Sequence, residues 1–203
     1  MEIKVKNLGL ISYNCLYSQM LRHHNDKSEQ DYQDEIWCVQ HPPIFTQGRY
    51  GSMNHKYNLH NIPLVMTDRG GQITYHGPGQ AIIYFMLDLK KNNVSIKALV
   101  KYIEQTCINQ LQTYGIKSYT LKNAPGIYTG LKKIASLGLR VKNGKTHHGL
   151  AINTSMNLAP FSYIDPCGYN GLEMTQISNF FPEIKINQVF YDYTKYFILN
   201  YFL

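Results

Sequence analysis

Residues 132–154 read KKIASLGLRVKNGKTHHGLAINT, and this stretch contains two β-type runs on either side of Asn143-Gly144. The runs are Ile134–Val141 and His148–Thr154, and both are rich in residues that favour strands. An Asn-Gly pair between two such runs is the strongest short-range signal for a β-hairpin, because both residues tolerate the positive φ of a tight turn. We therefore expect an antiparallel hairpin.

Apolar residues elsewhere repeat at helical or strand spacing. One helix is expected around Tyr13–Leu21, a second over Ile96–Leu111 with Ser95 as N-cap and Gly115 as its stop, and a third over Asn187–Leu203. Further short strands are expected at Ile36–Val39, Leu64–Met66, Ala81–Leu87, Ile116–Tyr119 and Gly126–Tyr128. Because strands and helices do not alternate regularly, these patterns indicate an α/β (α+β) fold with a mixed, largely antiparallel sheet and flanking helices.

Composition limits the class of protein. Hydrophobic residues make up 44% of the 203 residues and charged residues 16%, which excludes disorder over most of the length. No repeat or linker-like tract divides the chain, so residues 1–203 are expected to form a single domain. The most apolar windows are much shorter than the roughly 20 residues of a spanning helix, and no signal-peptide pattern is present, so we expect a cytoplasmic protein that does not bind a membrane.

The formal net charge of +7 fits a partner with an acidic surface. The positive residues are scattered, however, so a basic protein without a charged partner is the simpler explanation, and nucleic-acid binding is not expected. The four cysteines form no Cys-x-x-Cys pair, which suits reduced thiols. Cys15, Cys38 and Cys107 lie in apolar helical or strand patterns, where a cysteine is usually a small core residue.

A glycine-rich segment runs from Arg69 to Gln80 with four glycines in twelve residues. Such density lets the backbone approach a ligand closely, although an ordinary turn has a similar composition. The apolar run that follows is expected to be a strand and not a helix, so phosphate binding through helical amides is disfavoured. No metal site is expected either, because His23-His24 and His147-His148 are sequence neighbours that should point apart.

Two further residues are candidates for chemistry. Lys133 opens a strand of small and apolar residues, so it is a candidate for partial burial, where it would either have a lowered pKa or stand beside an anion; the alternative is a solvated lysine at a strand end. Cys167 lies between Pro166 and Gly168 in a turn, which makes it the thiol with potential as a nucleophile; the alternative is an inert loop thiol.

Together these segments resemble the lipoyl(octanoyl) transferase family, which moves octanoyl from acyl carrier protein to a lysine of a lipoyl domain. The resemblance spans about residues 41 to 176 in family order. Its motifs are His41-Pro42-Pro43-Ile44-Phe45-Thr46-Gln47-Gly48-Arg49, Arg69 to Gln80, Ala124-Pro125-Gly126-Ile127-Tyr128, Lys133 to Arg140, His148-Gly149-Leu150-Ala151-Ile152-Asn153, Pro166-Cys167-Gly168 and Glu173-Met174-Thr175. The stretch Lys145-Thr146-His147 departs from the family pattern.

The resemblance implies the fold of lipoate and biotin protein ligases, which is class II synthetase-like. It also implies that Cys167 carries the acyl group as a thioester and that Lys133 lowers the pKa of that thiol and exchanges protons. The residues that it implies for the acyl pocket are Arg69, Gly70, Gly71, Gln72, Ile73, Thr74, Tyr75, His76, Ser136, Leu137, Gly138, Gly149, Leu150 and Ala151.

The implied partners are acyl carrier protein as donor, and the apo lipoyl domains of 2-oxoacid dehydrogenases and the glycine cleavage H protein as acceptors, with a monomeric enzyme. No cofactor is implied, since phosphopantetheine belongs to the carrier and the thioester already supplies the activation. Two alternatives stay open. An ATP-dependent lipoate or biotin ligase of the same fold would need no cysteine nucleophile, and a non-catalytic carrier-binding module would use the basic surface alone.

Overall fold

The computed structural model describes residues 3–25, 32–51, 59–122, 124–165 and 171–201. Cys167, the predicted nucleophile, lies outside these residues. The helices are α1 (Tyr13–Asn25), α2 (Ile96–Thr113) and α3 (Ile186–Tyr201), with short 3₁₀ turns η1 (Ala159–Tyr163) and η3 (Ile177–Asn179). Within these described ranges, no helix is long and apolar enough to cross a bilayer.

A seven-stranded sheet forms the centre of the molecule. Its strands, in spatial order, are β1 (Lys4–Leu10), β2 (Glu35–Gln40), β6 (Gln80–Met86), β10 (Lys145–Asn153), β9 (Lys132–Lys142), β8 (Ala124–Thr129) and β7 (Tyr119–Leu121). A small sheet has the order β4 (Leu64–Met66), β3 (Ile44–Gln47), β5 (Ile73–His76). Only the β1–β2 and β3–β4 pairs are parallel among these strands. The expected mixed, largely antiparallel architecture is confirmed.

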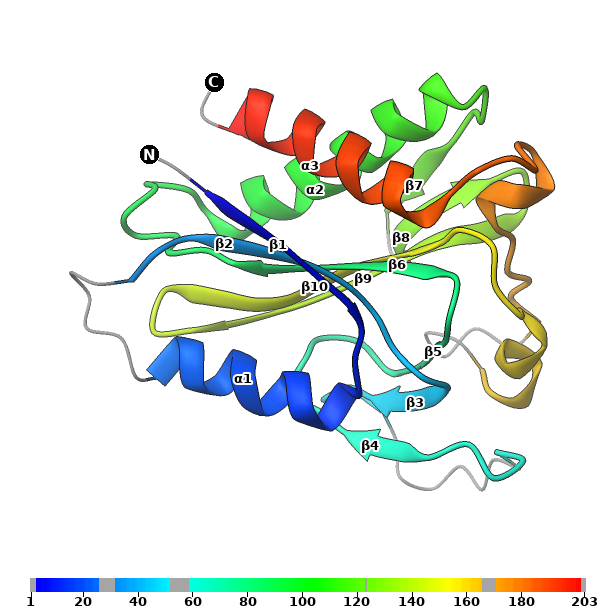
Figure 1. The fold of residues 1–203 in the computed structure, drawn as a ribbon, viewed down its shortest axis with the longest axis horizontal. Coiled ribbons are helices and arrows are strands. Elements are labelled where there is room, and N and C mark those ends of the chain that lie inside the picture. The colour runs from blue at the N-terminus through cyan, green and yellow to red at the C-terminus, as the bar shows by residue number, and fades with distance from the viewer. Residues whose placement is uncertain (1–2, 26–31, 52–58, 123, 166–170, 202–203) are drawn as a thin grey trace.

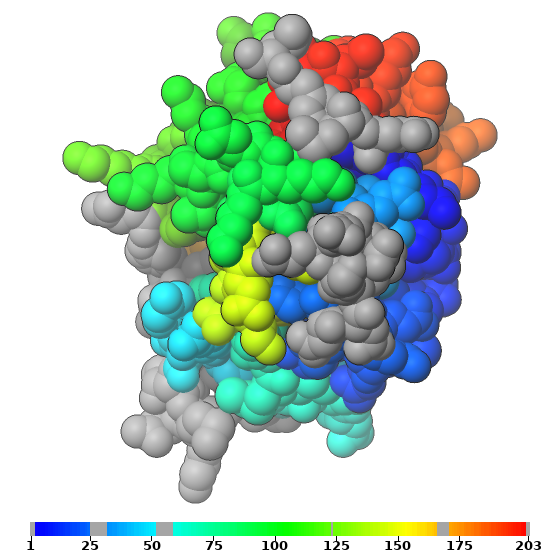
Figure 2. Space-filling view, turned by 90° about the vertical axis from the view of Figure 1, so that its left-hand side faces the viewer, coloured from blue at the N-terminus to red at the C-terminus, as the bar shows by residue number. Residues whose placement is uncertain are grey.

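The β9–β10 hairpin forms as Asn143-Gly144 predicts. Lys142 pairs with Lys145, and Asn143 and Gly144 have φ values of 53° and 81°. Positive φ at both central residues is the signature of a type I′ turn, whose twist matches that of the strands. The tip of this hairpin reaches the surface beside the green segment that follows β6 (Figure 2).

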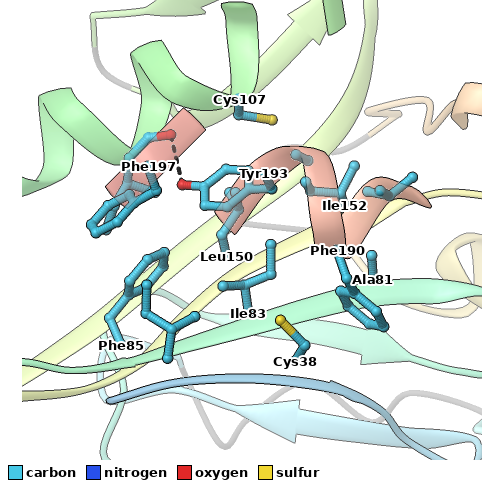
Figure 3. Close-up of a cluster of buried hydrophobic side chains, with 14 of the residues drawn as sticks. Cys38, Ala81, Ile83, Phe85, Cys107, Leu150, Ile152, Phe190, Tyr193 and Phe197 are labelled. Carbon is cyan, nitrogen blue, oxygen red and sulfur yellow. Dashed lines mark hydrogen bonds between the residues drawn. The ribbon is translucent and has the colours of Figure 1, made fainter. Parts of the chain in front are cut away.

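Helices α2 and α3 cover one face of the large sheet, while α1 and the small sheet cover the other (Figure 1). Ser95 caps α2 by accepting a hydrogen bond from the Ala98 amide at 3.1 Å, and Gly115 follows its end with φ +76°, so both predicted boundaries hold. The main core lies between α2, α3 and the sheet, where Phe85, Leu150 and Phe197 are fully buried (Figure 3).

Several sequence expectations need correction. Strands β1, β3 and β5 were not expected, and the strand predicted at 116–119 lies instead at Tyr119–Leu121. The glycines on both sides of β5 favoured a turn over residues 69–80, although Ile73, Thr74 and Tyr75 are β-branched or aromatic residues that favour a strand. Cys38 and Cys107 are buried as expected, but Cys15 is exposed, because the buried face of α1 contains Tyr13, Leu16 and Met20 instead.

Candidate functional site

A cavity opens between the two sheets, with about 510 Å³ of empty space including its open mouth. Its walls come from the loop before β5, from β5 and β6, from the middle of β9 and β10, and from the first turn of α1. The lining residues are Tyr13, Arg69, Gly71, Gln72, Ile73, Thr74, His76, Ile82, Tyr84, Ser136, Leu137, Gly138, His148, Gly149, Leu150 and Ala151.

The structure brings most of the predicted pocket residues to this cavity, and their role in binding stays a prediction. Two of them lie elsewhere. Gly70 lines a neighbouring outer groove and not the cavity, and its amide donates to the Leu139 carbonyl at 3.0 Å. Tyr75 packs instead against Phe45 and Phe161 beneath the small sheet. Sequence reasoning missed Tyr13, Ile82, Tyr84 and His148, because which side chains face a cavity between two sheets depends on long-range pairing.

A larger outer groove, with about 1120 Å³ of empty space, meets the cavity. The two share Gly71, Gln72, Leu137 and Gly138, so these residues form the passage between them. The groove continues over α2 and reaches Pro125. Cavity and groove therefore form one path from the surface to the space between the sheets.

The loop at the passage is held by the buried Arg69 side chain. Its Nη2 donates to the Thr46 carbonyl oxygen at 2.5 Å, its Nε donates to Thr46 Oγ1 at 3.2 Å, and its Nη1 donates to the Gly70 carbonyl at 2.9 Å. A Cβ on Gly48 would lie 2.4 Å from the Gly71 carbonyl oxygen, so only glycine allows this approach of the two backbones. Arg69 thus fixes the loop onto β3.

Histidines around the cavity are held in neutral forms. His76 Nδ1 lies 2.8 Å from Gln80 Oε1, an acceptor, so Nδ1 carries the proton, and burial lowers the pKa of His76 to about 3. His41 Nδ1 donates to the Ile11 carbonyl at 2.6 Å and Nε2 accepts from the Tyr84 hydroxyl at 2.8 Å. Burial lowers the pKa of His41 to about 4. Both imidazoles are therefore neutral at neutral pH.

The expectation that His147 and His148 point apart is wrong. His147 Nε2 lies 3.0 Å from Asp68 Oδ2 and His148 Nε2 lies 2.8 Å from Asp68 Oδ1. His148 has φ +62°, which breaks the alternation of the strand and turns both imidazoles to one side. The Tyr17 hydroxyl donates to Asp68 Oδ1 at 2.9 Å, and Arg140 Nε lies 3.7 Å from Oδ2.

This arrangement sets the charge states of the group. Burial alone would raise the pKa of Asp68, but the hydrogen bonds from His147 and His148 outweigh burial and hold that pKa well below its usual range. Burial, only partly offset by Asp68, lowers the pKa of His148 to about 4. Burial together with the neighbouring Asp68 carboxylate raises the pKa of Tyr17 to about 12.

Lys133 is fully buried, so the alternative of a solvated lysine at a strand end is wrong. Its Nζ donates to the Pro125 carbonyl oxygen at 2.7 Å and lies 5.4 Å from the centre of the Tyr128 ring. A Cβ on Gly126 would come within 2.4 Å of Lys133 Cε, so this glycine makes room for the side chain. Pro125 also lines the outer groove, which places the ammonium beside the path into the cavity.

The chain on the C-terminal side of the predicted nucleophile pairs with the Lys133 backbone. The Lys133 amide donates to the Glu173 carbonyl and the Thr175 amide donates to the Lys133 carbonyl, both at 2.9 Å. Neighbouring Lys132 forms a 2.7 Å ion pair with Glu173 on the surface. In the sequence, Cys167 precedes Glu173 by six residues.

The family described as the lipoyl protein ligase A/B catalytic domain matches residues 12–198, so the chain belongs to this family. Solved structures agree on the fold. A putative lipoate protein ligase from T. acidophilum superposes with a TM-score of 0.77 at 15% identity, covering 97% of this chain and 84% of that one. A biotin protein ligase from Aquifex aeolicus gives 0.57 at 13% identity, covering 97% and 69%.

Relatives with higher sequence identity show which activity within this family the chain has. An octanoyltransferase of Francisella tularensis subsp. novicida is 53% identical over 198 residues, covering 97% of this chain and 96% of the relative. An octanoyltransferase of Klebsiella pneumoniae is 47% identical over 183 residues, covering 90% and 85%. Within the ligase-like family, the chain is thus an enzyme of the octanoyltransferase group, and it transfers octanoyl.

Proposed function

We propose that the enzyme takes octanoyl from octanoyl-acyl carrier protein onto Cys167 as a thioester and passes it to the lysine of an apo lipoyl domain, with Lys133 as the proton-exchanging partner. The observation that carries this proposal is the buried Lys133 Nζ, which is bound to the carbonyl oxygen of Pro125 where the outer groove begins. An ammonium at that point can stabilise a thiolate and supply a proton, two properties that thioester exchange needs.

In the first half-reaction, the Cys167 thiolate attacks the thioester carbonyl of the donor. The carbon–sulfur bond to phosphopantetheine breaks, and the leaving thiolate takes a proton from the Lys133 ammonium. One thioester replaces another, so this step is close to thermoneutral.

In the second half-reaction, the neutral amine of the acceptor lysine attacks the Cys167 thioester. Its nitrogen gives a proton to neutral Lys133 while the carbon–sulfur bond breaks and the Cys167 thiolate returns. The product is an amide, which makes this step downhill. The thioester supplies the activation, so the proposed cycle needs no nucleotide and no resident cofactor.

The cavity supports the acyl part of the proposal. With the thioester carbon near Pro125, the octanoyl chain would pass between Gly71 and Gly138 into the space lined by Ile73, Leu150 and Ala151. Each methylene that leaves water contributes about 0.8 kcal/mol. Chain-length preference would then follow from the depth of the cavity.

The proposed donor is acyl carrier protein, and the proposed acceptors are lipoyl domains of 2-oxoacid dehydrogenases and of the glycine cleavage H protein. The formal net charge of +7 supports encounter with acidic domains. A cytoplasmic monomer without membrane or nucleic-acid partners remains the expectation.

An ATP-dependent ligase is the competing activity, since a neighbour of the same fold is a lipoate-protein ligase A bound with ATP, with a TM-score of 0.76. The test is formation of octanoylated lipoyl domain from octanoyl-acyl carrier protein in nucleotide-free buffer, read by mass spectrometry. We expect full modification, with no change when ATP is added. Modification that needs ATP and free octanoate would contradict the proposal.

A further inference from the structure

Asp68, His147 and His148 form a compact group that the proposed acyl transfer does not use. One oxygen or nitrogen of each residue lies within 4.8 Å of the others, and the imidazole side chains are 1% and 2% exposed. The Asp68 side chain is 32% exposed, so solvent reaches the group through the carboxylate. Two imidazoles and one carboxylate are a ligand set that zinc and related divalent metals take in proteins.

We propose that Asp68, His147 and His148 bind one divalent transition-metal ion of the zinc type. Tetrahedral coordination at zinc–nitrogen distances near 2.0–2.1 Å places ligand atoms about 3.3 Å apart. His147 Nε2 lies 3.0 Å from Asp68 Oδ2, His148 Nε2 lies 2.8 Å from Asp68 Oδ1, and one ligand atom of each residue lies within 4.8 Å of the others, so small side-chain shifts would admit the ion.

The backbone of β10 is bent toward this arrangement. Consecutive residues of a strand normally face opposite sides, and His148 avoids this only through a left-handed φ of +62°. Such a conformation is unfavourable for a non-glycine residue and persists where surrounding contacts impose it. The hairpin turn does not require it, since Asn143-Gly144 already closes the strands.

Hydrogen bonding to Asp68 occupies only the Nε2 side of each imidazole. The Nδ1 atoms of both His147 and His148 are buried without a hydrogen-bond partner, so only one nitrogen of each ring is used. Tyr17 donates to Asp68 Oδ1 at 2.9 Å and would orient the carboxylate as an outer-shell partner of a bound ion.

The cation that now faces Asp68 is Arg140 on β9, with Nε 3.7 Å from Oδ2. Its side chain is 31% exposed and can turn to solvent when a metal replaces it. Arg69 follows Asp68 in the chain, but its guanidinium is bound to Thr46 and does not occupy the site. An ion bound by Asp68, His147 and His148 would link the loop that precedes β5 to strand β10. His148 also lines the cavity, so the ion would lie beside the cavity wall.

The experiment is a titration of the full-length, chelator-treated protein with ZnCl₂ by calorimetry, and with CoCl₂ by visible absorption. We expect one equivalent to bind and the Co²⁺ spectrum to be that of a low-coordinate site. His147→Phe, which keeps an aromatic ring without a ligand nitrogen, should weaken affinity by about 10- to 100-fold or more. His60→Gln, at an exposed histidine outside the group, is the matched control and should bind as wild type.

A second variant keeps the test decisive if His147→Phe does not fold. Arg140→Gln removes the competing cation without touching a ligand, so it should tighten binding. Absence of a one-equivalent site in wild type, unchanged affinity in His147→Phe, weaker binding in Arg140→Gln, or loss of binding in His60→Gln would each overturn the proposal.

Discussion

Replacement of Lys133 by methionine separates the chemical role of this lysine from its structural one. The side chain is fully buried and donates to the Pro125 carbonyl oxygen at 2.7 Å. Loss of a hydrogen bond from a charged donor costs about 1.5–3 kcal/mol. Burial of an ammonium costs several kcal/mol, and methionine of similar length removes that penalty. We therefore expect a change in the free energy of unfolding of no more than about 2 kcal/mol, of either sign.

The rate of octanoyl transfer should respond very differently. Loss of a general acid–base group lowers rates by about 10²–10⁴-fold. The assay is the initial rate of lipoyl-domain octanoylation, measured beside urea unfolding of the same preparation. Lys132→Met is the matched control, because Lys132 is the preceding residue, its side chain is 53% exposed, and it forms a surface ion pair with Glu173. It should retain the wild-type rate. A Lys133→Met enzyme that is stably folded and transfers octanoyl at the wild-type rate would refute the role given to Lys133.

Three other predictions concern thiols, pH and the cavity. Burial raises the pKa of Cys38 to about 12 and that of Cys107 still further, so iodoacetamide should label exposed Cys15 in the native protein and should label Cys38 and Cys107 only after unfolding. Peptide mass mapping measures the labelling, and labelling of Cys38 in the native protein at neutral pH would contradict the prediction. His41 has its pKa lowered by burial from 6.5 to about 4, so the unfolded chain binds more protons at this residue, and the contribution of His41 to the free energy of unfolding should fall by up to about 3 kcal/mol as pH drops from 6.5 to 4. Urea unfolding across that range measures the loss, and an unchanged slope in His41→Asn would count against it. Ala151→Leu adds carbon atoms to the cavity wall and should raise KM for the octanoyl donor about tenfold, or about 1.4 kcal/mol, while the protein stays folded; an unchanged KM would place the acyl chain elsewhere.

Local sequence signals predicted the elements whose geometry is set locally. Asn143-Gly144 determines the β9–β10 turn because few other residues adopt positive φ at both positions. Ser95 determines the start of α2 because its hydroxyl satisfies an amide of the first turn. The edge strand β1 was not predicted, because it is mostly exposed and its sequence lacks the alternating apolar residues of a half-buried strand.

The candidate site was predictable only in part. The strand pattern identified Lys133 as a candidate, and resemblance to a family supplied its role and most of the cavity residues. The complete burial of Lys133 depends on Gly126, which leaves space for its side chain, and on the chain at Glu173, which pairs with its backbone. Asp68 and His148 lie 80 positions apart in the sequence, and their contact depends on the left-handed φ of His148. Strand periodicity gives the opposite expectation, so only the folded structure reveals this group.

The most direct test of covalent acyl transfer is the intact mass of the protein after mixing with octanoyl-acyl carrier protein in the absence of an acceptor, for wild type and Cys167→Ala side by side. A single hydroxylamine-labile octanoyl adduct on wild type alone is the predicted result. An adduct that persists on Cys167→Ala, or no adduct on either protein, would contradict the thioester mechanism.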